Sequence, residues 1–452
     1  MNTVSGVRKR IRRLGAVMLL AGPAIMPARA ATAEIPFQSI PAVGTPERLS
    51  LAEAKRLAYE HNWDLLAAKS DVDLAAAQTI VSREFPNPLL SWSISKVPIN
   101  GQSAATIEGP GFWARSYDTV LSINQLFEIG GKRRDRRMSA EQGLLAEQAR
   151  LADARRVLDL GVTKAYVAAV QAALNAQTLH DSAASLRHEA DIAAVRLQAG
   201  DISTADKSQI EILADRFELD ALSAEADALQ KRISVENLIG RPLPTGHWVA
   251  ADTLEGLVEP RVEDSDLRNI PRRPDLIEAE ATLQKTEADL RLQKALRIPD
   301  LTLVGMYEHN PPTGDQTIGL GLSFPLPLWN QNRGAIEAAA AARTQAAVQV
   351  DKISGQIAAD ISSARAAFQE AATRHENYVR IIRPKSAQIV KTITYAYEKG
   401  GTSLLDLLTA QRADNEVRLA AVQAAADLAI TQAALKAALT GIETTAAKTG
   451  NK

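Results

Sequence analysis

The sequence predicts a mainly α-helical protein with a small β part, and three observations lead to this fold class. Residues 131–198 contain no proline and, after the first residue, only two glycines, Gly143 and Gly161. One order of helix and strand patterns occurs twice along the chain. Four short runs alternate apolar and polar residues, as strands with two different faces do. Together these features predict long antiparallel coiled-coil hairpins joined to four strands.

The long stretch carries a seven-residue apolar repeat. Its positions are Leu144, Leu151, Leu158, Leu179 and Leu186, with Ala165, Ala172 and Ala193 at the remaining points. Such a repeat keeps one stripe against a partner helix and implies a left-handed supercoil. A single helix over this stretch would be about 100 Å long. A globular domain of ordinary size does not enclose such a rod, so the stretch is predicted to be a coiled-coil wall or strut.

The N-terminus is predicted to be an export signal over residues 1–30. Five basic residues precede an apolar core at 14–26, and Ala28-Arg29-Ala30 fits the small residues before a cleavage site. A disordered basic arm is the alternative, and it explains the order and lengths less well. No later stretch reaches 18 consecutive apolar residues, so no transmembrane helix is expected in the mature chain.

Composition excludes several classes of function. Of 52 basic residues, six lie in the export signal, which leaves 46 against 53 acidic residues and a net charge of −7. This charge argues against a nucleic-acid partner. The chain has no cysteine. Disulfides, thiolate metal sites, cysteine catalysis and a lipid-bearing N-terminal cysteine are therefore excluded.

The first repeat is predicted over residues 49–240, after an N-terminal extension at 31–48. A helix begins near Leu51 and ends before Pro86, and strand-like runs follow at 89–96 and 117–125. The long helix stops at Gly200, and a return helix runs from Ser203 to Gly240. We predict that the return helix packs through a seam formed by Ile212, Leu219, Leu222, Ala226, Leu229 and Ile233.

The second repeat is predicted over residues 274–441, after a connector at 241–273 and before a tail at 442–452. Asp275-Leu276 echoes Asp64-Leu65 at an offset of 211. The strand-like runs at 117–125 and 317–324 match at an offset of 200, as do the turns at 200–203 and 400–403. Pro384 lies inside the second long helix, 334–399, and is expected to bend it. A duplicated strand pair with a helical hairpin indicates one structural unit used twice.

The strand runs suggest a membrane. Their apolar residues share one face, and we predict that six of them face lipid, namely Trp92, Ile94, Leu121, Ile123, Leu320 and Leu322. Lengths of about 8–10 residues suit tilted strands in an outer membrane. A half-buried sheet in a soluble protein is the alternative. Four strands do not close a barrel, so a membrane barrel would have to be shared between copies of the chain.

The order of elements resembles the TolC-type outer membrane efflux proteins. The most specific match is 397–412, which resembles the second periplasmic tip of that family, and 272–276 resembles the start of its second repeat. The runs 125–133 and 330–334 resemble the CzcC-like subgroup that serves heavy-metal cation pumps. The resemblance implies homotrimers, in which four strands per copy form one twelve-stranded barrel above a long periplasmic α-barrel.

The resemblance also implies two kinds of site. The tip turns are expected to dock a periplasmic adaptor protein through Gly200, Asp201, Ser203, Gly400, Gly401, Thr402 and Ser403. Asp406 resembles a tip carboxylate of a periplasmic gate, where three copies would favour cations. An ordinary helix-start acid explains Asp406 equally well and explains its counterpart Asp206 better. Thr409 stands where relatives have a second acid.

The predicted function is the outer membrane channel of a tripartite efflux system in a Gram-negative bacterium, extending into the periplasm. It would conduct substrate passively, with heavy-metal cations favoured, as a homotrimer in outer membrane lipid that is joined to an adaptor and an inner-membrane pump. Drug efflux and type I protein secretion remain open, as does a soluble periplasmic scaffold. No catalytic motif, cofactor site or complete metal site is recognised in the sequence, and its six histidines are interpreted as solvated.

Overall fold

The computed structural model describes residues 46–95, 118–258, 272–310 and 315–441. The chain divides into two units, Met1–Ala42 and Val43–Lys452, and all described residues lie in the second. The predicted export signal, most of the N-terminal extension, the middle of the connector and the tail lie outside the described residues.

The first repeat follows the predicted order, with one difference. Its elements are β1 (Arg48–Leu49), α2 (Leu51–His61), α3 (Trp63–Arg83), β2 (Leu89–Ser95), β3 (Asp118–Phe127), α5 (Lys132–Gln198) and α6 (Thr204–Leu238). The single first helix that we expected is two helices, because Asn62 is extended and its side chain caps α3 by accepting from Leu65 N at 3.0 Å. The Asn62 amide also donates to Leu238 O at 3.0 Å, which ties this break to the end of α6.

The long helix α5 spans 67 residues without interruption, as predicted. On its seven-residue lattice, Leu158, Ala172, Leu186 and Ala193 are buried, and the other four positions are partly buried. The lattice therefore marks the packed face of α5. Gly131 precedes the helix with a φ of 80°, a left-handed conformation that suits glycine.

The predicted seam of α6 is wrong. Ile212, Leu219 and Leu222 are exposed, Ile212 by 68%. The helix packs on α5 through another stripe instead, which consists of Ile210, Leu213, Ala214, Phe217 and Ala221. The sequence of α6 contains two apolar stripes, and its spacing does not reveal which one faces the neighbouring helix. The exposed stripe is left uncovered in a single chain.

The second repeat keeps the order of helix, two strands, long helix and return helix, with one helix before its strands and a π-helix within its long helix. Its elements are α7 (Pro274–Ala295), β5 (Leu301–Asn310), β6 (Asp315–Ser323), α8 (Arg333–Asn377), the π-helix η2 (Tyr378–Ile382), α9 (Arg383–Glu398) and α10 (Leu404–Leu439). The connector contributes β4 (Val249–Ala250) and a 3-10 turn, η1 (Glu255–Leu257). Strand β4 pairs in parallel with β1, so the N-terminal extension and the connector meet.

The second long helix is interrupted where the sequence predicts a bend. Pro384 lies at the start of α9, directly after the five-residue π-helix η2. Proline has no N–H to donate, and its ring clashes with the carbonyl four residues earlier. A π turn widens the helix locally, which lets the chain continue past the proline.

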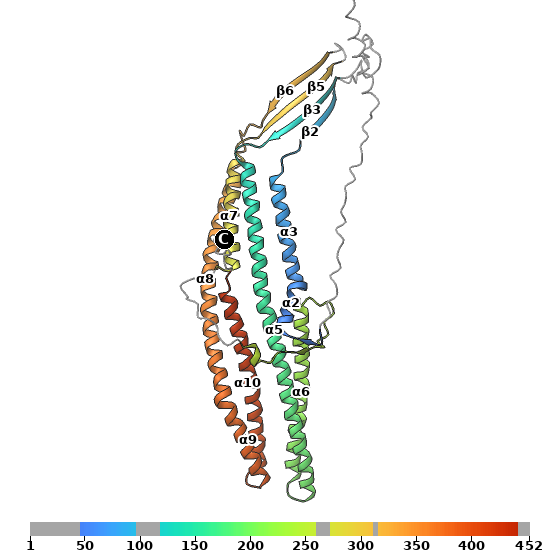
Figure 1. Ribbon diagram of the computed structural model, residues 1–452, viewed down its shortest axis with the longest axis vertical. Helices are drawn as coiled ribbons and strands as arrows, with labels where there is room; N and C mark the ends of the chain where they lie inside the picture. The colour runs from blue at the N-terminus through green and yellow to red at the C-terminus, as the bar shows by residue number, and fades with distance from the viewer. Residues whose placement is uncertain (1–45, 96–117, 259–271, 311–314, 442–452) are drawn as a thin grey trace, which may run out of the picture. The chain divides into compact units, whose positions relative to one another are not determined.

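The four long strands form one antiparallel sheet in the order β2-β3-β5-β6. Figure 1 shows this sheet at one end of the long helices, with the turns α5–α6 and α9–α10 at their other end. Trp92 pairs with Leu121, and Leu303 pairs with Leu322. Trp92 and Leu303 are equivalent residues of the first strands, because they are 211 apart as Asp64 and Asp275 are. Their partners on the second strands, Leu121 and Leu322, are therefore equivalent too, and these are 201 apart.

The predicted offset of 200 for the second strands is therefore wrong by one residue. The two helices that follow these strands agree with 201, because Gly131 and Asn332 precede α5 and α8 and both have left-handed backbones. A shift by one residue moves every side chain to the other face of a strand. Only the pairing register reveals this error.

The main core lies where α2, α5 and α10 meet β1 and the end of α6. Tyr166 stacks on the buried Trp248 with ring centroids 5.8 Å apart. Around this pair lie buried side chains that include Leu49, Leu65, Val162, Val235, Ile239 and Leu254. The core joins the connector to both hairpins.

Candidate functional site

The two tip turns have the same geometry. Gly200 and Gly400 have φ values of 80° and 73°, which glycine adopts without strain. Asp201 N donates to Arg196 O at 2.9 Å, and Gly401 N donates to Ala396 O at 2.7 Å. Both turns therefore end their long helix in the same way, by bonding its last carbonyls.

A capping box opens each return helix. Ser203 Oγ accepts from Asp206 N at 3.1 Å, and Ser403 Oγ accepts from Asp406 N at 3.2 Å. In return, each carboxylate accepts from the backbone N–H of its serine. Asp406 also accepts from Thr402 Oγ1 at 2.9 Å. Hydrogen bonds from Ser403 and Thr402 hold the pKa of Asp406 below its ordinary value.

These contacts give both acids a local role at the start of a helix. Asp406 differs from Asp206 by the extra bond from Thr402, since Ile202 stands at the equivalent position of the first tip. Gly200, Asp201, Gly400, Gly401 and Ser403 are all exposed, so the turns are accessible to a partner. Docking of an adaptor and the gate function of Asp406 stay predictions.

The two hairpins contact each other just above the tips. The Arg196 guanidinium on α5 lies over the Tyr397 ring on α9, 5.3 Å from its centroid. Further from the turns, Gln411 Nε2 on α10 donates to Glu189 Oε1 on α5. Burial raises the pKa of Glu189, although the hydrogen bond from Gln411 and the charge of His188 oppose this shift. Glu189 Oε2 and Gln411 Oε1 are both buried without a hydrogen-bond partner.

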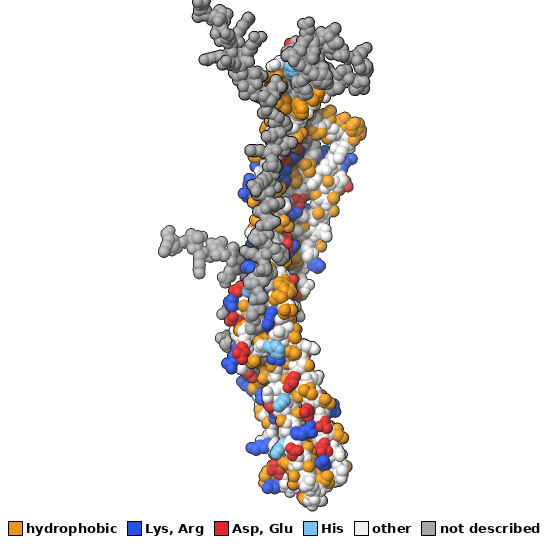
Figure 2. Space-filling view, turned by 90° about the vertical axis from the view of Figure 1, so that its right-hand side faces the viewer, with side chains coloured by type: hydrophobic (Ala, Val, Ile, Leu, Met, Phe, Trp, Pro, Cys, Tyr) orange, Lys and Arg blue, Asp and Glu red, His pale blue; other side chains and the backbone are white. Residues whose placement is uncertain are grey.

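The strand residues predicted to face lipid all lie on one face of the sheet. Trp92, Leu121, Tyr307 and Ile318 form one row across the four strands, and all four are exposed. The remaining predicted residues fall in neighbouring rows of that face, namely Ile94, Ile123, Leu320 and Leu322. Figure 2 shows charged side chains of both signs over the helices, below the end that carries the strands.

The opposite face of the sheet is largely polar. Its rows include Ser93, Val120, Glu308 and Thr317, then Ser95 with Asp118, and Asn310 with Asp315. A sheet with one apolar and one largely polar face fits a position between lipid and water.

A buried ion pair fixes the junction between the sheet and α5. Lys132 Nζ lies 2.7 Å from Asp300 Oδ1 and donates to Ile298 O at 2.6 Å. Asp300 also accepts from Ile129 N at 3.1 Å. Glu128 and Arg136 form a two-bond ion pair beside it, at 2.6 and 2.8 Å. This cluster of charges joins β3 and α5 to the turn between α7 and β5.

The sequence analysis missed these contacts between repeats. Lys132 lies in the run 125–133, which resembles the CzcC-like subgroup. That resemblance drew attention to the region but did not indicate that Asp300 is the partner of Lys132. Asp300 lies just before the first strand of the second repeat and belongs to none of the motifs singled out in the sequence. Glu189 and Gln411 are 222 residues apart, and no local pattern connects them.

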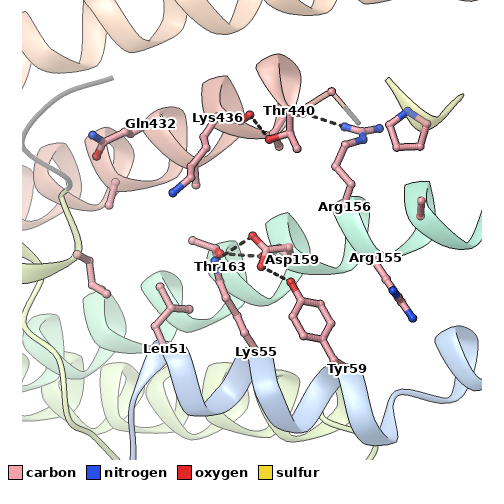
Figure 3. Close-up of a pocket in the computed structure, with 17 residues that line it drawn as sticks. Leu51, Lys55, Tyr59, Arg155, Arg156, Asp159, Thr163, Gln432, Lys436 and Thr440 are labelled. Atoms are coloured by element: carbon pink, nitrogen blue, oxygen red, sulfur yellow. Dashed lines mark hydrogen bonds and ion pairs between the residues drawn. The ribbon is translucent and has the colours of Figure 1, made fainter. Parts of the chain in front are cut away.

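The best-defined pocket, about 340 Å³, lies beside the core between α2, α5 and α10. Figure 3 shows Lys55 and Tyr59 of α2 pointing toward Asp159 of α5, at 2.9 and 2.6 Å. Arg156 pairs with Asp153 at 2.8 Å. Because Asp159 is already bound by Lys55 and Tyr59, we interpret these three residues as contacts that hold α2 on α5.

In the part of the chain that the structure describes, no three histidine or acidic side chains gather as a metal ion would require. One described helix, α5, includes an 18-residue window apolar enough to cross a bilayer. Val162, Tyr166 and Val170 of this helix are buried in the main core. The packing of α5 thus accounts for part of its apolar content, since 39% of that window is buried.

The chain is similar to curated and solved proteins over most of its length. It is 24% identical over 375 residues to the cobalt-zinc-cadmium resistance protein CzcC of Cupriavidus metallidurans, covering 82% of this chain and 85% of that protein. A membrane protein from Pseudomonas aeruginosa has the same fold, with a TM-score of 0.75, 18% identity and coverage of 88% and 93%. The CmeC outer membrane channel of Campylobacter jejuni aligns with a TM-score of 0.73, 19% identity and coverage of 86% and 85%.

A family model described as outer membrane efflux protein matches residues 55–241 and 269–441. The two matched segments correspond to the two repeats, apart from the first turn of α2 and the middle of the connector. This match confirms the resemblance predicted from the tip motif, and the chain belongs to the outer membrane efflux protein family.

Proposed function

We propose that three copies of this chain form the outer membrane duct of a tripartite efflux system. In this proposal twelve strands enclose a pore in the membrane, and six helical hairpins extend it into the periplasm. Substrate passes from an inner-membrane pump and a periplasmic adaptor to the exterior. The duct itself is passive and carries out no chemistry.

The sheet is the observation that carries this proposal. Its apolar face has the composition of a lipid-facing surface, and its polar face has that of a pore lining. Within the described residues, β2 and β6 each pair on one side only. Unpaired strand edges are not tolerated in lipid. Since β2 and β6 run in opposite directions, joining them between copies continues the antiparallel pattern.

The helices support assembly from several copies. Apolar side chains on α6 that no other described helix covers include Ile212, Leu219 and Leu222, and α8 and α9 likewise expose Val348, Ile389 and Tyr395. Contiguous exposed apolar surfaces mark sites of protein interaction. Neighbouring copies in a closed ring would bury these stripes.

The tips support a link to a partner. Gly200, Asp201, Ser203, Gly400, Gly401, Thr402 and Ser403 form two matching turns at the ends of the hairpins. In a threefold assembly these turns would present six similar surfaces to an adaptor. Asp406 lies beside the second turn, and three copies would place carboxylates around the axis, which favours cations.

We propose heavy-metal cations as the substrate class. This rests on the similarity to a cobalt-zinc-cadmium resistance protein, together with the negative charge of the mature chain. Deleting the gene and scoring growth on zinc, cobalt, cadmium, copper and several antibiotics tests it. Growth impaired on metals alone supports cation efflux, whereas sensitivity confined to antibiotics would make the chain a drug duct.

The channel itself is tested in planar bilayers. Purified trimers that come apart on heating and conduct ions are expected, with a preference for cations. Asp406→Asn should weaken that preference, while Asp206→Asn, which changes the matching capping box, should leave it unchanged. A freely soluble monomer without conductance would support a periplasmic scaffold instead.

A further inference from the structure

The junctions between strand and helix differ in exposure between the two repeats. At the offset of 201, Arg333 is the counterpart of Lys132. Lys132 is only 3% exposed, because the turn between α7 and β5 covers it. Arg333 is exposed. The second junction thus lacks the cover that the first one has within the chain.

The repeat identifies the missing cover. The turn before β5, 296–300, lies against Lys132, and its counterpart at the offset of 211 is the turn before β2, 85–89. That turn belongs to an edge strand, so its outer side meets no strand of the same chain. If β6 of one copy joins β2 of the next, turn 85–89 comes to lie against Arg333 as turn 296–300 lies against Lys132.

We infer that the β6–α8 junction of one copy docks on the α3–β2 junction of the next copy, with Trp329 packed against Leu89. This inference rests on the proposed assembly and assigns the residues that lock it. Arg333 takes the place of Lys132 and reaches the Asn87 carbonyl, which corresponds to Ile298 O. The ring then contains the same joint six times, three times within chains and three times between them.

Charged side chains hold the junction within one chain, whereas apolar side chains would hold the junction between copies. Within the chain, Glu128 and Asp300 lie on either side of Lys132. Their counterparts between copies are Trp329 and Leu89, so apolar residues replace both acids together. Trp329 is 92% exposed and Leu89 is 64% exposed in the single chain. Burying two such side chains against each other removes apolar surface from water and so stabilises an assembly.

The receiving turn is held from its inner side by β3 and α5 of its own chain. An open pocket of about 510 Å³ lies beside it, lined by residues 85–88 and 125–128 and by Arg133. Phe85 is held there by the Arg133 guanidinium, 3.6 Å from the ring centroid. The Gln125 amide donates to Pro86 O at 3.0 Å. The turn is therefore braced on its inner side and open on its outer side.

Disulfide cross-linking tests the inference, since the chain has no cysteine of its own. The pair Leu89→Cys with Asn330→Cys corresponds to Asp300 and Ile129, which are neighbours within the chain because Ile129 N donates to Asp300 Oδ1 at 3.1 Å. Oxidation of the full-length double variant in membranes should convert monomers into covalently linked trimers on denaturing gels. Each single variant should remain a monomer.

The matched control is Ile129→Cys with Asp300→Cys. It should lose its free thiols on oxidation and still run as a monomer, because its disulfide lies within one chain. In addition, Trp329→Ala should lower the temperature at which native trimers dissociate, whereas Trp92→Ala on the outward face should not.

The possible outcomes separate the inference from the proposed function. Native trimers in which the control pair closes and the Leu89–Asn330 pair does not would overturn the docking and leave the duct standing. Absence of trimers in the unchanged protein would remove both the duct and the docking.

Discussion

The two repeats of this chain agree at their tips and differ at the opposite end of their long helices. Both tips use a left-handed glycine and a serine–aspartate capping box. At the sheet, the first junction buries Lys132 against Asp300, while the second leaves Trp329 and Arg333 exposed. The two repeats therefore agree in the turns, whose contacts are local in sequence. Their junctions differ, because only the first junction has its partner, the turn between α7 and β5, within the chain. The long helices diverged as well, since only the second contains a proline.

The largest expected effect comes from the buried pair of the first junction. Lys132→Met leaves Asp300 without its cation and should cost about 3 kcal/mol, the lower end for a buried pair, because Asp300 is 22% exposed and keeps the bond from Ile129 N. Arg137→Met, which removes an exposed pair with Glu141 in the same helix, should cost about 0.5 kcal/mol. Denaturant unfolding in detergent measures both. If both variants lose the same free energy of unfolding, the pair of Lys132 and Asp300 contributes no more to stability than an exposed ion pair does.

The next effect tests the difference between the long helices. Ala184 in α5 is the counterpart of Pro384 at an offset of 200 and is exposed. Ala184→Pro should cost about 3 kcal/mol, because the uninterrupted helix α5 has no π turn to accept it. Ala184→Ser serves as the control and should cost less than about 1 kcal/mol. A proline variant as stable as the parent would show that α5 tolerates the same interruption.

The tips should respond alike. Ser203→Ala and Ser403→Ala each remove the side-chain acceptor of a capping box, at a cost of about 1 kcal/mol. Hydrogen exchange of the amides in the first turns of α6 and α10 measures this loss locally. A clear difference between the two tips would contradict their structural equivalence.

The smallest effect concerns pH and the contact between the hairpins. Because burial raises the pKa of Glu189, the folded chain holds this proton to a higher pH than the unfolded chain does. The free energy of unfolding should therefore decrease as the pH rises above the ordinary glutamate range and through the raised pKa. A protonated Glu189 can donate to the unpaired Gln411 oxygen, which strengthens the contact at acid pH.

Thermal unfolding as a function of pH measures this effect. Glu189→Gln should remove this part of the pH dependence, whereas Glu211→Gln on the outer surface of the same hairpin should retain it. If the pH dependence of the unfolding temperature is unchanged in Glu189→Gln, the folded chain does not bind a proton at Glu189 more tightly than the unfolded chain does. That result would contradict the prediction.

Much of the fold could be predicted from local patterns. The seven-residue lattice of α5, the glycine turns and the strand alternation all depend on neighbours close in sequence, and the structure agrees with each. The prediction that the tips dock an adaptor rests on family resemblance alone, since a glycine turn with a capping box also ends ordinary hairpins. The contact between Glu189 and Gln411 could not be predicted, because the two residues are 222 positions apart and no local sequence pattern connects them.

The sequence by itself determined the elements, their duplication and the family, because periodicity, turn residues and motifs are local properties. The tertiary structure decided which of two apolar stripes on α6 is packed, which residues of the two repeats are equivalent across the sheet, and which junction is covered. These are choices between surfaces of similar composition. Pairing register and packing distinguish them, and both arise only when segments far apart in the chain meet.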